Sequence, residues 1–343
     1  MAGTAQRRVT LCALAAALVT LSMPAWGRRL RDMAGREVTL PDTLRRVLPY
    51  DNKTNVLLFP VAGELMIARA RWMRASYFMF ITPAWSRLRE VDMRQAEEVM
   101  RLHPEALIVG AFPEDRTSIE EYAAFAKRVN VPLVVVDIDL MHMDKAIDFL
   151  GNLLGRQARA AELSGFIRSV YRDVEEIQRR NTVGEKRPRA YMANDANGLR
   201  TAPRGSRHAQ LFDVLGVENV VAAPPGANGF AYVSIEQLLL WRPEYILCVG
   251  KGEVNPYRTV CKSSLWRTLP AVQSGRVYYV PEDPYSWFDI PPSANRLAGL
   301  IWFMGLFGEQ TEDITEKHIR EFYRLFYNYT LSDREYRRLF EWR

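Results

Sequence analysis

The feature that most constrains the fold is a repeat in which a helical segment leads through a proline into an apolar run. Residues 96–110 read AEEVMRLHPEALIVG, and residues 235–250 read IEQLLLWRPEYILCVG. In both, six residues separate a glutamate, Glu97 or Glu236, from a Pro-Glu pair. Proline lacks the N–H that a helix interior needs, and a continuous apolar run is typical of a strand buried on both faces. Two such units predict two halves of similar topology.

A single long helix is predicted between the two units. No proline occurs from Arg156 to Arg180, and only Gly165 interrupts residues that favour helix. Apolar side chains follow the three-and-four spacing of one helix face at Leu163, Phe166, Ile167, Val170, Tyr171, Val174 and Ile177. Asn181 and Gly184 are expected to end the helix. Its length fits a rigid connector between two lobes, although an ordinary crossover helix has the same periodicity.

Short apolar runs on both sides of this helix predict strands. They cover residues 55–59, 106–110, 132–138, 189–194, 218–223, 244–250 and 276–280. Because helical stretches separate them, they predict parallel sheets with crossover helices, and so an α/β protein. The expected organisation is an N-terminal lobe over residues 28–155, a connecting helix over 156–182 and a C-terminal lobe over 183–343.

The two ends of the folded chain have their own patterns. Ala34-Gly35 lies between two short strand-like runs and predicts a hairpin. Three helices are expected at the C-terminal end, over residues 292–307, 315–330 and 332–342. Ser332 followed by Glu335 predicts a capping box at the start of the last one.

Residues 1–27 form a separate segment. Arg7 and Arg8 precede an apolar run over residues 9–23, and small residues lie before a cleavage point after Gly27. This is the layout of a secretory signal peptide, and the run of 15 residues is shorter than the roughly 20 that span a bilayer as a helix. An uncleaved anchor is the alternative. We expect an exported, periplasmic protein.

The cysteines agree with export. Cys12 lies inside the apolar run and follows Leu11 rather than a small residue, so no lipid anchor is expected. Cleavage would leave Cys248 and Cys261, an even pair in an oxidising compartment and therefore a candidate disulfide. Two free thiols are the alternative.

Composition excludes several classes. The chain is 48% hydrophobic and 25% charged, with a formal net charge of +6 and no long basic block, so neither disorder nor nucleic-acid binding is expected. The sequence has no phosphate-binding loop, Gly-x-Ser-x-Gly, His-Glu-x-x-His or Cys-x-x-Cys motif. We therefore expect a protein that is not an enzyme and carries no metal centre or cofactor of its own.

Four stretches together resemble the periplasmic binding proteins of ABC importers for iron–siderophore, haem and cobalamin. These are DMAGREVTLPDTLRRVL at 32–48, the two glutamate–proline units, VQSGRVYYVP at 272–281 and IREFYRLFYNYTLSD at 319–333. The resemblance implies the class III architecture of that family, two α/β lobes joined by one rigid helix. It also implies a monomer that delivers a ligand to an ABC permease in the inner membrane.

The same resemblance implies a role for the two glutamates. The family places one glutamate on each lobe against arginines of the permease, and Glu97 and Glu236 occupy those positions. Arginine pairs with carboxylates bidentately, so two carboxylates on separate lobes can report lobe spacing to a partner. The alternative is that both are solvated helix residues, especially Glu97, which has Glu98 beside it.

Ligands of open parallel sheets bind beyond the carboxyl ends of the strands. That rule gives candidate ligand-binding residues at Phe59, Tyr77, Trp85, Phe112, His142, Asn194, Arg204, Phe230, Tyr232, Lys251, Tyr257, Tyr285 and Trp287. Aromatic and cationic side chains together suit a bulky anionic chelate. Each has a structural alternative, and His142, close to Asp137 and Asp139, is open to metal or haem-iron ligation as well.

The sequence thus predicts a receptor that captures an iron chelate, in particular a ferric siderophore, between two lobes. Haem, cobalamin and molybdate remain alternatives within the same fold. An exported α/β enzyme that uses the cleft and a cell-envelope scaffold are the alternatives from other classes.

Overall fold

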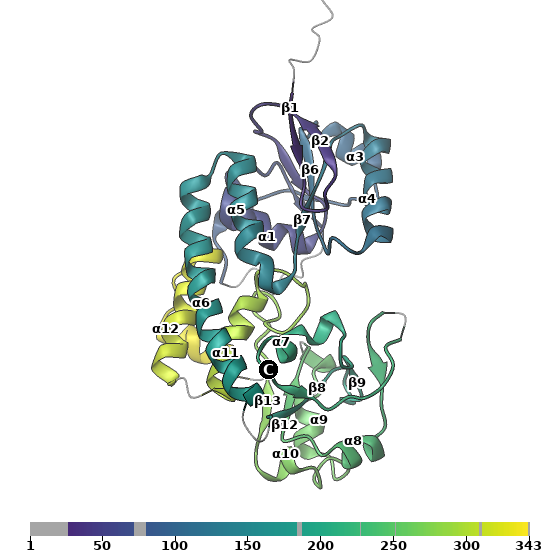
Figure 1. The fold of residues 1–343 in the computed structure, drawn as a ribbon, viewed down its shortest axis with the longest axis vertical. Coiled ribbons are helices and arrows are strands. Elements are labelled where there is room, and N and C mark those ends of the chain that lie inside the picture. Colours follow the sequence, from purple (N-terminus) through teal and green to yellow (C-terminus); the bar gives the residue numbers. More distant parts are fainter. Residues whose placement is uncertain are drawn as a thin grey trace, which may run out of the picture.

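A computed structural model describes residues 27–71, 80–183, 187–226, 228–250, 252–308 and 311–341. It has two α/β lobes, one above the other in Figure 1, with a long helix along one side of both. We call the elements before this helix the N-lobe and the sheet-forming elements after it the C-lobe. The predicted fold class is confirmed.

The N-lobe begins with the predicted hairpin. Strands β1 (Arg28–Arg31) and β2 (Glu37–Leu40) pair antiparallel, and Gly35 takes the positive φ of 78° that this tight turn needs. The N-lobe strands that follow are β3 (Val47–Pro49), β4 (Arg69–Ala70), β5 (Glu90–Val91), β6 (Ala106–Ala111) and β7 (Leu133–Asp137).

All N-lobe pairings after the hairpin are parallel. β6 lies between β3 and β7, while β4 pairs with β5. A parallel bridge between Val47 and Met66 brings the chain that enters β4 alongside β3. The spatial order is therefore β5, β4, β3, β6, β7. The predicted strands at 106–110 and 132–138 are confirmed.

The N-lobe helices are α1 (Asn52–Ala62), α2 (Pro83–Ser86), α3 (Ala96–Arg101), α4 (Arg116–Val129) and α5 (Met143–Leu154). The strand predicted at 55–59 is wrong, because these residues lie inside α1. Asp51 caps this helix by accepting a hydrogen bond from the Thr54 N–H, and almost every side chain of α1 is buried. A helix buried on all faces has the same continuous apolar pattern as a central strand.

The long helix is α6 (Gln157–Val183), and its prediction is confirmed. Leu163, Ile167, Val170 and Val174 are buried along the expected face. Tyr171 ties α6 to the end of the N-lobe sheet, because its hydroxyl donates to the Leu140 carbonyl.

The C-lobe has strands β8 (Arg189–Ala193), β9 (Arg200–Thr201), β10 (Glu218–Asn219), β11 (Ala231–Tyr232), β12 (Tyr245–Cys248) and β13 (Val277–Tyr279). Four of them form a parallel sheet in the order β10, β8, β12, β13, while β9 and β11 pair antiparallel. The C-lobe helices are α7 (Gln210–Val214), α8 (Ile235–Trp241), α9 (Tyr257–Lys262) and α10 (Pro270–Gln273). The predicted C-lobe strands are present, and the one at 218–223 is shorter than expected.

The repeat exists in three dimensions. α3 leads into β6 and α8 leads into β12, and the residue before each proline is left-handed, with φ of 47° at His103 and 49° at Arg242. A left-handed residue ends a helix and turns the chain sharply toward the next element. Both units therefore change direction in the same way.

The chain ends with α11 (Arg296–Phe307), α12 (Glu312–Phe326) and α13 (Asp333–Leu339), and the capping box of Ser332 and Glu335 is confirmed. α11 packs on α6 and α12, and α12 also contacts α1 of the N-lobe. In Figure 1 these helices lie beside α6, at the level where the two lobes meet. The C-terminal helices thus pack against the connection between the lobes rather than extending the C-lobe. Within the described residues, no helix is both long and apolar enough to cross a membrane.

Candidate ligand-binding cleft

A cleft of about 1490 Å³ lies between the lobes, and residues from both lobes line it. The N-lobe wall includes Tyr50 after β3, Arg71 after β4 and Asp92 after β5. The C-lobe wall includes Asn194 after β8 and Glu282 shortly after β13. The cleft therefore lies where the carboxyl ends of strands from two parallel sheets face each other, as the general rule for such sheets predicts.

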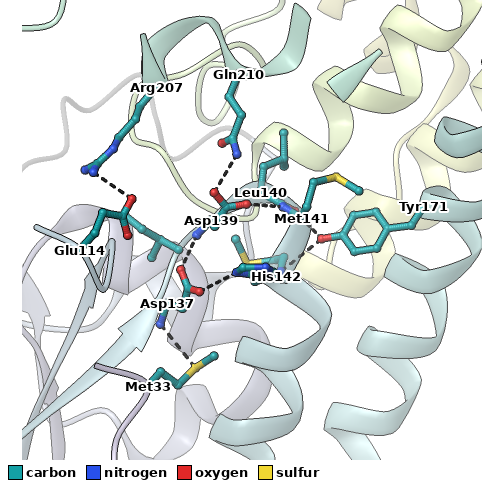
Figure 2. A network of polar contacts seen from close by, with 12 residues as sticks. Met33, Glu114, Asp137, Asp139, Leu140, Met141, His142, Tyr171, Arg207 and Gln210 are labelled. Carbon is teal, nitrogen blue, oxygen red and sulfur yellow. Dashed lines mark hydrogen bonds and ion pairs between the residues drawn. The ribbon is translucent and has the colours of Figure 1, made fainter. Parts of the chain in front are cut away.

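The two remaining N-lobe strands end at a different place, where the lobes contact each other directly. Figure 2 shows Arg207 of the C-lobe in an ion pair with Glu114, which follows β6, at 2.9 Å. The Gln210 side-chain amide donates to Asp139, which follows β7, at 2.8 Å. These polar contacts join the lobes beside the cleft.

Arg296 strengthens this junction from the C-terminal helices. Its guanidinium is fully buried and donates to the Gln210 side-chain oxygen at 2.9 Å and to the Ile138 carbonyl at 2.8 Å. Burial lowers the pKa of Arg296, while the nearby carboxylates of Asp289 and Asp139 act in the opposite direction. One side chain therefore contacts both lobes.

Among the described residues, the N-lobe wall of the cleft carries three arginines, which differ in their partners and exposure. Arg94 is held by Asp92, with contacts of 2.7 and 2.9 Å, and this pairing lowers the pKa of Asp92 to about 2. Arg71 is largely exposed and lies 3.9 Å from Asp92. Arg128 is also exposed, with its guanidinium 5.0 Å from the centre of the Phe125 ring. Arg71 and Arg128 therefore offer positive charge to a ligand on this side.

Aromatic side chains contribute to both walls. Tyr50 packs edge-on against Tyr122 and Phe125, at 4.7 and 5.5 Å between ring centres. Burial raises the pKa of the Tyr50 hydroxyl, and Tyr122 and Asp51 add to that shift. Tyr285 lines the opposite wall but is only 2% exposed, so it offers little surface to a ligand.

Only part of the predicted ligand-binding set lies at the cleft. Asn194 and Tyr285 line it, whereas Tyr77 and Lys251 lie outside the described residues. Six others are not among the lining residues, namely Phe112, His142, Arg204, Phe230, Tyr232 and Tyr257.

Several of these six are engaged elsewhere. His142 Nδ1 lies 2.8 Å from Asp137 in the network of polar contacts of Figure 2, and Arg204 pairs with Glu218 at 2.8 Å. Phe112 lies beneath the Arg207 guanidinium, and Tyr232 is 73% exposed on the antiparallel ribbon. The described residues hold no group of three His, Cys, Asp or Glu side chains arranged for a metal ion.

Three predicted residues lie in the hydrophobic core instead of the cleft. Phe59 of α1 packs on Trp85 with 4.1 Å between ring centres, and Trp85 and Trp287 have no exposed surface. Trp287 packs against Trp302 of α11 and Phe340. These three side chains offer almost no surface to a ligand in the cleft, because their large apolar surfaces fill the core.

The disulfide prediction is also wrong. Cys248 lies in β12 and is buried, Cys261 lies on α9 and is exposed, and both are free thiols. Burial raises the pKa of each thiol, and a hydrogen bond with Tyr257 opposes that shift for Cys261.

The two repeat glutamates are accessible. Glu97 of α3 is 83% exposed and lies 3.7 Å from Arg101, one turn further along the helix. Glu236 lies in the first turn of α8, where a hydrogen bond with Ser234 lowers the pKa of its carboxyl. Each lobe therefore presents one charged carboxylate on an exposed helix surface, and the docking role remains a prediction.

Two α/β lobes, a single connecting helix and a cleft at the facing strand ends define a two-lobed solute-binding protein. The chain belongs to the periplasmic binding protein family, whose model matches residues 86–284.

Comparisons with individual proteins agree with this family. The molybdate-binding protein MolA of Haemophilus influenzae is 22% identical over 92% of this chain and 95% of its own length. Its structure with molybdate bound has a TM-score of 0.68 at 19% identity, over 89% of this chain and 99% of that one.

One further relative and one further solved structure are also similar to this chain. The haem uptake protein IsdE of Staphylococcus aureus is 25% identical over 48% of this chain and 58% of its own length. The structure of an ABC transporter solute-binding protein from Sulfurospirillum deleyianum has a TM-score of 0.81 at 22% identity, over 91% of this chain and 99% of that one. At these identities the structural matches establish the fold alone.

Proposed function

We propose that this protein is the substrate-binding protein of an ABC importer and that it captures a negatively charged metal chelate, of the ferric siderophore class, in the interlobe cleft. The observation that carries this proposal is a cleft of about 1490 Å³ with Arg71, Arg128 and Arg200 on its walls. Pockets for ordinary small ligands measure roughly 300–1,000 Å³, so this volume favours a bulky ligand. Arginines on both walls favour a ligand with anionic oxygens on more than one side.

Molybdate is the second candidate. It is supported by the similarity to MolA, which extends over 95% of that protein's length. The cleft walls disfavour a small bare oxyanion, because Glu90, Asp92 and Glu282 lie among the lining residues and repel it. A chelate places its anionic groups further apart and can reach the arginines selectively.

The ligand class is tested on the purified chain without residues 1–27. Intrinsic fluorescence and native mass spectrometry are recorded with ferric enterobactin, ferrichrome, haem, cyanocobalamin and molybdate. We expect saturable binding of ferric enterobactin with a Kd on the order of 1 μM or lower, about 8 kcal/mol of binding free energy. Binding of molybdate alone would replace the chelate by the second candidate, and binding of none would refute both.

We also propose that Glu97 and Glu236 dock the loaded protein on its permease at the periplasmic face of the inner membrane. Support comes from their exposure and from their equivalent positions in the two repeat units. The double variant Glu97→Ala/Glu236→Ala should lose uptake by intact cells while its ligand affinity stays unchanged. Glu120→Ala, an exposed carboxylate on α4, is the matched control. Lost affinity in the double variant, or equal uptake in both variants, would contradict the docking role.

A further inference from the structure

We infer that Arg200 is the C-lobe residue that binds an anionic oxygen of the ligand, and that Phe230 positions it. This inference rests on the proposed function. Arg200 lies on β9 and lines the cleft. Among the described lining residues of the C-lobe wall it is the only cation, and it faces a wall on which Arg71 and Arg128 provide the positive charge.

The guanidinium of Arg200 is fixed before any ligand arrives. Its Nη1 donates to the Asn194 side-chain oxygen at 2.7 Å, and a guanidinium nitrogen lies 3.8 Å from Asp195. The plane of the group stacks on Phe230, with 3.7 Å from its carbon to the ring centre. Stacking covers one face of a guanidinium and leaves its N–H edge available for a bidentate contact.

Phe230 also stacks on a second ring. Its partner is His208, with 4.2 Å between ring centres and 27° between planes. His208 Nδ1 lies 2.5 Å from the carboxylate of Asp289, which is 2% exposed. A series of contacts thus runs from a buried carboxylate through two rings to the arginine at the cleft wall.

The chain around Phe230 fits closely against this stack. Gly229 has a φ of 72°, and a Cβ at this position would lie 2.9 Å from the His208 ring. The Ser206 hydroxyl donates to the Gly229 carbonyl at 2.7 Å. Both features place the loop that carries Phe230 close against His208.

This arrangement defines the charge pattern of the ligand. A chelate that spans the cleft meets Arg71 and Arg128 on one wall and Arg200 on the other. Ligands with anionic oxygens on opposite faces, such as a ferric tricatecholate, therefore gain a contact that a neutral ferric trihydroxamate lacks. Because the guanidinium is already oriented, little side-chain entropy is lost when the contact forms.

The test compares Arg200→Gln with Arg204→Gln, an arginine nearby in sequence that pairs with Glu218 and does not line the cleft. Arg200→Gln should weaken binding of ferric enterobactin by roughly 10- to 100-fold, the usual effect of losing a charged hydrogen bond. Binding of ferrichrome, which is neutral, should change less than threefold relative to wild type, on the order of 0.6 kcal/mol. Arg204→Gln should resemble wild type with both compounds.

The positioning role is tested by a double-mutant cycle. Phe230→Leu should weaken binding of ferric enterobactin by about three- to tenfold, and Arg200→Gln/Phe230→Leu should equal Arg200→Gln alone. Additive losses would show that Phe230 does not act through Arg200. Circular dichroism establishes that each variant is folded.

The outcomes separate this inference from the proposed function. If the wild type binds molybdate and no chelate, the chelate proposal is wrong, and the same variants are compared with molybdate. Equal affinity of Arg200→Gln and wild type for the anionic ligand that binds would overturn the inference. Binding of none of the compounds would overturn both.

Discussion

The carboxyl edge of the N-lobe sheet is used in two ways. Beyond β3, β4 and β5 the chain lines an open cleft, and Arg71 there is 64% exposed. Beyond β6 and β7 the chain meets the C-lobe, and Arg296 at that junction is completely buried. The same sheet edge therefore lines the cleft and also forms the junction between the lobes.

The difference between the two regions lies in how their charges are satisfied. At the junction between the lobes, Arg296 donates to Gln210 and to the Ile138 carbonyl, and the nearby carboxylates of Asp289 and Asp139 oppose the effect of burial on its charge. In the cleft, Arg71 and Arg128 keep exposed guanidinium groups. Buried polar groups whose hydrogen bonds are satisfied specify one packing, whereas exposed charges are available to another molecule. Stability and binding should therefore respond to different arginines.

The largest expected effect separates the two regions by stability. Arg296→Met removes the buried cation and leaves Gln210 and the Ile138 carbonyl without their donor, so unfolding free energy should fall by about 3 kcal/mol. Arg71→Gln in the cleft should change it by less than about 0.5 kcal/mol. Urea denaturation followed by circular dichroism measures both, and equal values for the two variants would abolish the distinction.

The next effect concerns ligand affinity, which should depend on the arginines of the cleft rather than on the buried Arg296. Arg71→Gln and Arg128→Gln should each weaken binding of ferric enterobactin by about tenfold, since each removes one exposed cation from the N-lobe wall. Their melting temperatures should match that of the wild type. Fluorescence titration provides the affinities, and Arg116→Gln, at the start of α4, is a control outside the cleft lining. Unchanged affinity in both cleft variants would show that the ligand lies elsewhere.

The sequence predicts the long elements of the fold better than the short strands that lead into the cleft. The strands at 106–110 and 132–138 were predicted because they are buried on both faces, and the long helix because one of its faces is apolar. β4 and β5 have two residues each, too short for any pattern, so the cleft residues that follow them, Arg71 and Asp92, were not predicted. Short strands take their conformation from their neighbours in the sheet, which no local pattern records.

The predicted site residues show a second limit. Trp85 and Trp287 were assigned to the cleft by the rule that ligands bind beyond the carboxyl ends of parallel strands, yet burial of their large apolar surfaces stabilises the core. Arg200 was not predicted as a ligand-binding residue. Phe230 was predicted to bind the ligand directly, and its contact with Arg200 was not foreseen. The contact between them depends on the antiparallel pairing of β9 with β11, which joins segments 30 residues apart in the chain.

A smaller effect concerns the exposed ion pair at the junction between the lobes. Glu114 and Arg207 have side chains that are 63% and 43% exposed, so Glu114→Gln should lower stability by less than about 1 kcal/mol. The decrease should shrink further as salt is added, because ions screen an exposed pair. Thermal unfolding at low and high salt measures it. A loss as large as that of Arg296→Met would mean that this pair, rather than the buried arginine, fixes the lobes.

The smallest effect is a titration at the cleft. Arg94 holds the pKa of Asp92 at about 2, below the ordinary 3.8, so this carboxylate stays charged as pH falls through 4 and gains its proton only near pH 2. The pair therefore contributes to the stability of the folded state at pH values above the pKa of Asp92 in the unfolded chain. This contribution is lost as pH falls through the pKa of Asp92 in the folded protein. Because the Arg94 side chain is 87% exposed to solvent, the effect of the pair on stability should be small, and the titration is followed by NMR of the Asp92 carboxyl carbon. In Arg94→Gln the same carboxyl should titrate closer to 3.8, and a midpoint that does not move would show that Arg94 leaves Asp92 free to meet Arg71 or a ligand.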